Sequence, residues 1–154
     1  MPELPEVETT LKAIKSFEKK ILNSVSIHNP NLRWLVDNDI NKKIAGKKVR
    51  QIFRRAKYLI FDFNDCQPIV HLGMSGTLRI MNKGDNFYKK HDHAELIFSK
   101  SKLIYNDPRR FGSIHVTEKY TEHFLIKNLG PEPLSKNFSA DYLYKAVQCS
   151  KTNI

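Results

Sequence analysis

The pattern that most limits the fold of this chain is a change in hydrophobic period near residue 22. Before this point apolar residues recur at helical spacing. From there to about residue 119 they alternate with polar residues and are mostly β-branched or aromatic. Period-two alternation is typical of half-buried strands, and many short strands with close turns indicate a sandwich or barrel. The sequence therefore predicts an α+β, mainly β fold: a two-layer antiparallel β-sandwich flanked by helices.

The expected elements follow from this pattern. A first helix is predicted over residues 3–21, with Pro5 in its first turn, where a missing N–H costs no hydrogen bond. Near the other end, residues 122–129 predict a short amphipathic helix, and Ser139 is a candidate N-cap for a last helix. The strands are expected at Ser24–Ile27, Val49–Phe63, Ile69–Met81, Ala94–Ser99 and Leu103–Tyr105.

The charge balance points to an anionic partner. The 154 residues, enough for one domain with a buried core, include 26 Lys and Arg against 16 Asp and Glu, for a formal net charge of +10. Nucleic acid and acidic lipid are the two common partners of such chains. The apolar runs are far shorter than the ~20 residues of a membrane span. The two cysteines, Cys66 and Cys149, form no C-x-x-C pair, which favours an intracellular protein without a structural zinc site in this chain.

The first residues are candidates for covalent chemistry. If Met1 is removed, Pro2 begins the chain with a secondary amine, and a helix N-terminus disfavours the protonated form of such a group. A neutral amine can attack a sugar C1′ and form an iminium, and the adjacent Glu3 can transfer protons. Proline and glutamate are also common at ordinary helix starts, so this pair alone does not establish a catalytic site.

Four strings of residues, in the same order, change that interpretation. They are MPELPEVET at residues 1–9, RRAKYL at 54–59, HLGMSG at 71–76 and DPRRFG at 107–112. LRW at 32–34, HDH at 91–93 and LGPEPL at 129–134 add weaker support. Together they resemble the formamidopyrimidine-DNA glycosylase family, the bacterial 8-oxoguanine glycosylases, over nearly all of residues 2–154.

The resemblance implies roles for four catalytic residues. Pro2 resembles the family's Schiff-base nucleophile, and Glu3 its proton donor at the sugar ring oxygen. Glu6 resembles a supporting carboxylate of the same pocket. Lys57, expected on a strand, resembles an essential lysine that grips a phosphate or assists elimination. Without the RRAKYL match, Lys57 would be interpreted as one more solvated lysine.

The resemblance also implies a set of DNA contacts. Met74, Arg109 and Phe111 resemble the three residues that fill the space left by a flipped-out nucleotide, with two apolar wedges and one group for the orphaned base. By themselves the two apolar residues would more often belong to the core. A metal site at residues 91–93 is not expected, because further ligands are lacking, and His71 is expected to be structural. The candidate phosphate contacts are Arg33, His91, Arg110 and Lys151.

The implied activity is excision of oxidised purines from damaged double-stranded DNA, followed by strand cleavage at the abasic site. We expect a monomer that acts without a metal or cofactor of its own. Residues 1–134 are expected to form the catalytic domain and residues 135–154 the start of a linking helix, cut off before the family's helix–two-turn–helix and zinc-finger modules. Three alternatives remain: an endonuclease VIII-like enzyme for oxidised pyrimidines, a non-catalytic DNA-binding remnant, and a generic basic RNA-binding protein.

Overall fold

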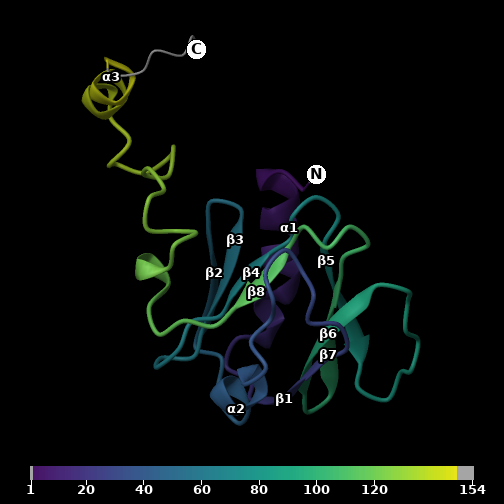
Figure 1. Ribbon diagram of the computed structural model, residues 1–154. Coiled ribbons are helices and arrows are strands. Elements are labelled where there is room, and N and C mark those ends of the chain that lie inside the picture. The colour runs from purple at the N-terminus through teal and green to yellow at the C-terminus, as the bar shows by residue number, and fades with distance from the viewer. Residues whose placement is uncertain (1, 149–154) are drawn as a thin grey trace.

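The predicted sandwich is present in the computed structural model, which describes residues 2–148 (Figure 1). Two four-stranded sheets, each antiparallel throughout, have the orders β1-β6-β7-β5 and β2-β3-β4-β8. The first sheet contains β1 (Leu22–Ile27), β6 (Asp92–Phe98), β7 (Ser101–Asn106) and β5 (Thr77–Asn82). The second contains β2 (Gln51–Arg55), β3 (Tyr58–Asp62), β4 (Ile69–His71) and β8 (Ser113–His115).

The core lies between the two sheets and helix α1. Apolar side chains from both sheets, such as Leu96 and Phe98 on one and Leu59 and Phe61 on the other, form a single buried cluster. Helix α1 (Leu4–Ile14) contacts β2, β3 and β5, and so bridges the sheets along one side. Its buried face is the stripe that the helical spacing predicted. The members of that stripe on the helix are Val7, Leu11 and Ile14.

Helix α1 is shorter than the prediction of residues 3–21. It passes into a 3-10 turn at Lys15–Phe17, and Lys19 then adopts a positive φ of 67°. The Lys19 N–H donates to the Val49 carbonyl at 2.7 Å, and the Val49 N–H donates to the Lys20 carbonyl at 2.9 Å. These tertiary bonds replace the helical ones, so Ile21, expected on the apolar stripe, is 54% exposed.

Two predicted strands are each split into two. The run over 49–63 forms β2 and β3, joined by a tight turn at Ala56 and Lys57, and Ala56 has a φ of 49°. The run over 69–81 forms β4 and β5, because Gly73 turns the chain with a φ of 64°. Period-two patterns do not show where a hairpin reverses when apolar residues continue on both arms. The predictions also missed β8 and the short helix α2 (Ile40–Ile44).

The C-terminal part matches the predictions only partly. A 3-10 helix at Tyr120–Glu122 leads into successive turns rather than the amphipathic helix expected over 122–129. The turns allow Ile126 to pack into a small second cluster of buried side chains while Phe124 contacts Trp34. The capping prediction is confirmed, since Ser139 Oγ accepts the Tyr142 N–H at 3.1 Å at the start of α3 (Ala140–Gln148).

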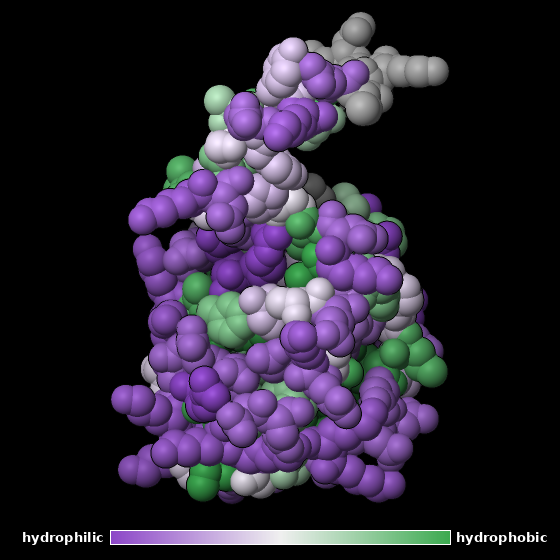
Figure 2. Space-filling view, turned by 90° about the vertical axis from the view of Figure 1, so that its left-hand side faces the viewer, coloured by the Kyte–Doolittle hydropathy of each residue, from purple (hydrophilic) through white to green (hydrophobic). Residues whose placement is uncertain are grey.

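Helix α3 has no buried residues and stands apart from the two sheets (Figures 1 and 2). Each helix within residues 2–148 is too short or too polar to cross a bilayer. The described part of the chain therefore consists of one sandwich with an extended C-terminal segment.

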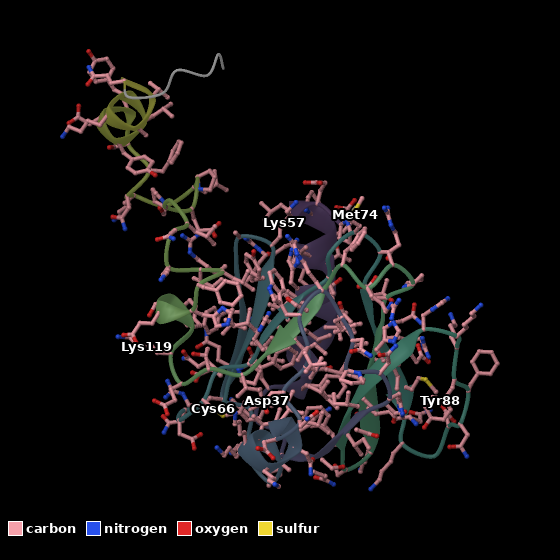
Figure 3. The ribbon with its side chains drawn as sticks, in the orientation of Figure 1. Asp37, Lys57, Cys66, Met74, Tyr88 and Lys119 are labelled. Carbon is pink, nitrogen blue, oxygen red and sulfur yellow. The ribbon has the colours of Figure 1, made fainter. Side chains whose placement is uncertain are left out.

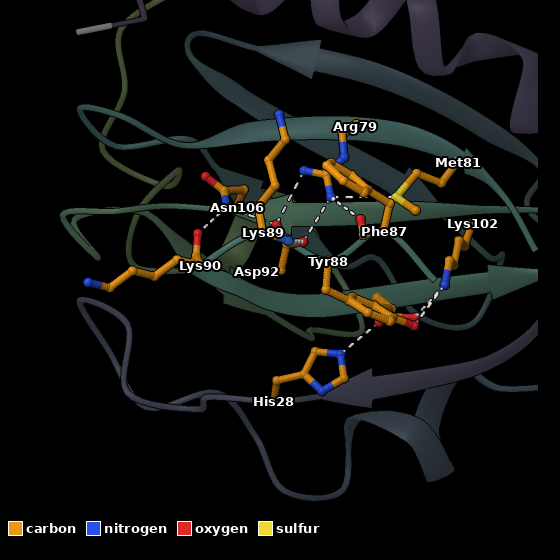
Figure 4. A network of polar contacts seen from close by, with 11 residues as sticks. His28, Arg79, Met81, Phe87, Tyr88, Lys89, Lys90, Asp92, Lys102 and Asn106 are labelled. Carbon is orange, nitrogen blue, oxygen red and sulfur yellow. Dashed lines mark hydrogen bonds and ion pairs between the residues drawn. The ribbon is translucent and has the colours of Figure 1, made fainter. Parts of the chain in front are cut away.

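The outer face of the first sheet is covered by the loop between β5 and β6 (Figure 4). Beneath it lie a buried carboxylate and a buried ammonium, Glu95 Oε2 and Lys102 Nζ, 3.6 Å apart. The ammonium also donates to the Tyr88 hydroxyl at 2.8 Å, and His28 Nε2 lies 2.8 Å from Glu95 Oε1. This network fixes the loop at one side of the sandwich through charges that have partners although they are buried.

Candidate functional site

The predicted catalytic residues gather where α1 begins. Pro2 is half-buried and precedes Glu3, whose N–H donates to Glu6 Oε2 at 3.0 Å. Lys57 Nζ lies 3.6 Å from Glu3 Oε2. The carboxylates of Glu3 and Glu6 thus meet the ammonium of Lys57, which is distant in sequence, next to Pro2. The prediction that Lys57 lies on a strand is wrong, because Lys57 occupies the turn between β2 and β3, where its side chain projects beyond the end of the sheet.

Glu132 holds the turn that presents Lys57. Its Oε1 accepts the Ala56 N–H at 2.6 Å and an Arg55 N–H at 2.8 Å, and its Oε2 lies 3.4 Å from Arg54. Burial alone would raise the pKa of Glu132, but the bonds from Ala56 and Arg55 and the charge of Arg54 outweigh it and lower the pKa. The turn is thereby fixed to the segment that follows the sandwich.

The same turn is tied to α1 from the other side. Arg54 Nε donates to Glu8 Oε2 at 2.8 Å, while its Nη1 donates to the Ala56 carbonyl at 2.9 Å. Arg54 is only 19% exposed, so this ion pair is partly shielded from water and is stronger than a surface pair. Arg54 therefore joins α1 to the turn that carries Lys57. We call the group formed by Pro2, Glu3, Glu6 and Lys57 the Glu3 cluster.

A groove of about 730 Å³ lies beside this cluster and brings together most of the predicted DNA contacts. Met74 is 37% exposed and Phe111 43% exposed, unlike the core residues they would otherwise resemble. The Arg109 guanidinium carbon lies 5.0 Å from the Phe111 ring centroid. Figure 3 shows Met74 and Lys57 at the same end of the sandwich. The groove is lined by Asn31, Leu32, Arg33, His71, Gly73, Met74, Arg109, Arg110 and Phe111.

Two of the three segments that line the groove, residues 71–74 and 109–111, are held together by Asp107. Its fully buried carboxylate accepts the Ser75 hydroxyl at 2.6 Å, the Gly112 N–H at 2.8 Å and the Arg109 N–H at 3.3 Å. The backbones also touch, because a Cβ on Gly73 would lie 2.3 Å from the Gly112 nitrogen. The loop with Met74 and the loop with Arg109 and Phe111 are therefore held as one unit.

His71 lies between the groove and the turn that carries Lys57. It lines the groove, and its ring lies 4.8 Å from the Tyr58 ring, next to Lys57 in sequence. Burial, together with the positive charges of Lys57 and Arg33, lowers its pKa below the ordinary value of 6.5. A neutral ring at pH 7 agrees with the structural role expected for it.

One predicted DNA contact among the described residues, His91, lies outside the groove. His91 is half-buried with a φ of 76°, and its carbonyl accepts the Asp107 N–H at 3.1 Å. His93, two residues further on, donates from Nε2 to the Asp107 carbonyl oxygen at 2.8 Å. Lys151 lies outside the described residues.

Asp107, Ser75 and Glu132 were not among the residues predicted for the site. All three lie within the strings that carried the resemblance, DPRRFG, HLGMSG and LGPEPL. The signal was therefore present, but nothing in one sequence shows that a carboxylate in one string accepts a hydrogen bond from another string. These residues position the candidate site rather than line it.

The chain is similar to known proteins over the residues that form the candidate site. A family model described as the formamidopyrimidine-DNA glycosylase N-terminal domain matches residues 1–114, which include the Glu3 cluster and the whole groove. The chain belongs to the formamidopyrimidine-DNA glycosylase family. Formamidopyrimidine-DNA glycosylases of Pasteurella multocida and Hydrogenovibrio crunogenus are each 46% identical to it, over 154 and 157 residues.

Solved structures of glycosylases from this family confirm the fold. The Lactococcus lactis Fpg in complex with DNA containing N7-benzyl-Fapy-dG superposes with a TM-score of 0.89 at 32% identity, over 99% of this chain and 58% of that chain. The same protein in complex with DNA containing an abasic site gives 0.87 at 31% identity, over 98% and 58%. The chain spans 56% of the length of the Pasteurella and Hydrogenovibrio relatives.

Proposed function

We propose that this chain carries the catalytic half of a base-excision repair glycosylase and abasic-site lyase that acts on oxidised purines in duplex DNA. The observation that carries the proposal is the approach of Lys57 to Glu3, 3.6 Å apart, beside Pro2 and at the same end of the molecule as an exposed groove with two arginines. In this proposal residues 1–134 are the catalytic domain and residues 135–154 begin a linking helix. The protein acts inside the cell as a monomer without a cofactor.

The proposed chemistry starts with the secondary amine of Pro2 after removal of Met1. Its lone pair attacks the sugar C1′, the glycosidic bond breaks, and the base leaves with the bonding electrons and takes up the proton that the Pro2 nitrogen loses. Glu3 then donates a proton to the ring oxygen as the C1′–O bond opens, which leaves an iminium between Pro2 and C1′. The iminium makes the 2′ hydrogen acidic, and its loss expels the 3′ phosphate.

Glu6 and Lys57 support these steps. Because Glu6 accepts the Glu3 N–H, it fixes the backbone next to the nucleophile. Lys57 places its ammonium beside the Glu3 carboxylate, where it binds a DNA phosphate or stabilises the leaving one. The strength of each interaction depends on exclusion of water by bound DNA, since Glu3 is 59% exposed in the free chain.

The groove is proposed to hold the distorted duplex. Removing a nucleotide from the stack costs a few kcal/mol, and the exposed Met74 and Phe111 side chains supply apolar surface to fill the gap. Arg109 beside Phe111 supplies donors for the orphaned base, and Arg33 and Arg110 supply positive charge for phosphates. We place His91 and Lys151 among the phosphate contacts on the basis of the family resemblance.

The test separates covalent chemistry from base excision. We expect this chain to form a borohydride-trapped adduct with DNA that already contains an abasic site, because this step needs only Pro2, Glu3 and an aldehyde. Excision of 8-oxoguanine from duplex by residues 1–154 should be slow or undetectable, because the nucleotide must also be held out of the stack. Each 1–2 kcal/mol of transition-state contact that these residues do not supply costs roughly 5- to 30-fold. Adduct formation is read as a shifted band on a denaturing gel, with both substrates run in parallel.

Matched variants define the outcome. Pro2→Gly should sharply reduce trapping, and Glu3→Gln should reduce base excision more than trapping, whereas Glu118→Gln at an exposed position should change neither. If folded protein shown to begin at Pro2 gives no adduct with abasic DNA, the chain is a non-catalytic DNA-binding domain. Preference for oxidised pyrimidines over 8-oxoguanine would instead indicate endonuclease VIII-like specificity.

A further inference from the structure

A second basic surface lies at the end of the molecule opposite to the candidate site. It is formed where the chain leaves α1 and where it enters β2, around a hollow of about 650 Å³. Cys66 is next in sequence to Asp65, which lines this hollow, and it lies at the opposite end of the sandwich from Lys57 and Met74 (Figure 3). We call this surface the distal basic face, and its hollow is lined by Lys19, Lys47, Lys48, Val49, Arg50, Phe63, Asn64 and Asp65.

The lysines of the distal basic face fall into two groups. Near the hollow, Lys42, Lys43 and Lys47 have carboxylate partners at Asp39, Asp37 and Asp65. By contrast, Lys19, Lys20 and Lys48 are exposed and make no salt bridge with any residue in the described range 2–148. The free lysines therefore project positive charge that nothing in this part of the chain neutralises.

The backbone holds these lysines side by side. The Lys19 N–H bonds to the Val49 carbonyl at 2.7 Å, the Val49 N–H bonds to the Lys20 carbonyl at 2.9 Å, and Ile21 pairs with Lys48 in an antiparallel bridge. Lys19 keeps a positive φ of 67° at this junction, a conformation uncommon for a residue with a side chain. The charges are thus placed by tertiary structure and do not belong to a mobile tail.

The distal basic face is electrically separate from the groove. The strand β2 (Gln51–Arg55) lies between Arg50 and the turn with Lys57, and five residues of strand span about 17 Å. The Debye length at 0.1 M salt is about 10 Å, shorter than this separation. Each face therefore attracts phosphates largely independently of the other.

We propose that the distal basic face binds the backbone of a second DNA duplex, so that the chain passes directly from one duplex to another during its search. The inference rests on the proposed binding of DNA in the groove. DNA fits better than a lipid surface, because the aromatic residue at the hollow, Phe63, is 5% exposed, and the exposed side chain of Ile21 beside Lys48 gives little apolar area to insert into a bilayer. On the side of the molecule shown in Figure 2, hydrophilic residues predominate over the lower half, with scattered hydrophobic ones between them.

The test measures how fast a fluorescent duplex leaves the protein as unlabelled competitor duplex is increased. With a second binding face, the dissociation rate should rise with competitor concentration, because the incoming duplex binds before the first has left. Lys19→Gln/Lys48→Gln should make the rate independent of competitor. In the unmodified chain the competitor effect should weaken with salt, and these two phosphate contacts should contribute about 1.8 to its log–log slope. Lys20 is left intact because its ammonium lies 4.7 Å from the Phe17 ring centroid.

The control changes the same charge elsewhere. Lys127→Gln/Lys136→Gln removes two exposed lysines in the C-terminal segment that leads to α3, and it should retain the competitor dependence. Equal effects of both pairs would mean that only net charge matters and would overturn the proposal. A rate that does not depend on competitor in the unmodified chain would also overturn it.

Two further readouts separate the possible failures. Borohydride trapping on abasic DNA should be unchanged in Lys19→Gln/Lys48→Gln, so loss of trapping in the unmodified chain rejects the proposed function and not the distal basic face. Sedimentation with vesicles of phosphatidylserine and phosphatidylcholine gives the last comparison. If the vesicles bind, if Lys19→Gln/Lys48→Gln abolishes that binding, and if competitor DNA has no effect, the face recognises lipid and the DNA proposal is wrong.

Discussion

Asp107→Asn is the substitution whose effect the structure defines most closely. The Asp107 carboxylate is 0% exposed, and each of its oxygens accepts two donors. Oδ1 accepts the Ser75 hydroxyl at 2.6 Å and the Arg109 N–H at 3.3 Å, while Oδ2 accepts the Gly112 N–H at 2.8 Å and, more weakly, the Tyr105 hydroxyl at 3.4 Å, which also donates to the His71 carbonyl at 3.0 Å. An asparagine side chain has only one oxygen, so its NH₂ group faces a backbone N–H donor, that of Arg109 or that of Gly112, in either orientation.

The cost follows from these bonds. A buried donor left without an acceptor costs about 1–3 kcal/mol. The Ser75 hydroxyl can rotate toward another acceptor, so the main loss comes from the backbone N–H that faces the NH₂ group. We therefore expect Asp107→Asn to lower the free energy of unfolding by about 3 kcal/mol. For a domain of this size the corresponding fall in Tm is roughly 6–12 °C. Duplex binding should also weaken at temperatures where the variant is folded, because Arg109 and Phe111 lose the anchor of their loop.

Urea unfolding followed by circular dichroism measures the stability change, and fluorescence anisotropy measures duplex binding. The matched control is Asp85→Asn, the same chemical change in the exposed turn after β5, which should shift stability by less than about 0.5 kcal/mol. A loss below about 1 kcal/mol for Asp107→Asn would refute the argument. It would show that the four donors find other partners and that this carboxylate does not anchor the two groove loops.

Three other predictions concern the N-terminus, the salt response and pH. Intact-mass measurement should show a chain that starts at Pro2, and complete retention of Met1 would remove the proposed nucleophile. Duplex affinity should fall steeply with salt, and Arg33→Ala or Lys151→Ala should each reduce the log–log slope by about 0.9 for all sequences alike; a flat response would assign the groove charge to another partner. Burial, with the charges of two nearby histidines, lowers the pKa of His115 from 6.5 to about 4. The unfolded chain thus binds a proton that the folded chain does not, so stability should decrease from about pH 6.5 to about pH 4. His115→Phe should make that decrease smaller in urea titrations, and an unchanged pH profile would contradict the assignment.

How much the sequence determines is clearest at the two ends of the sandwich. Period-two alternation identified the sandwich, and the helical stripe of Val7, Leu11 and Ile14 identified α1, because burial against a core imposes these periods directly on the sequence. The cap at Ser139 was also predictable, since its hydrogen bond joins residues only three positions apart. The strings shared with the family were sufficient to select Pro2 as a candidate without knowledge of its surroundings.

Tertiary structure alone decided which of those residues meet. Lys57 lies beside Glu3 only because β2 and β3 reverse at Ala56, and that reversal depends on a carboxylate at Glu132, 76 residues further along the chain. The end of α1 was likewise set by bonds from Lys19 to Val49, which replaced a helical turn that the apolar pattern would have continued. Local periodicity records which side chains are buried. It contains no information on which distant backbone or carboxylate will accept a given hydrogen bond, and that choice positions the candidate site.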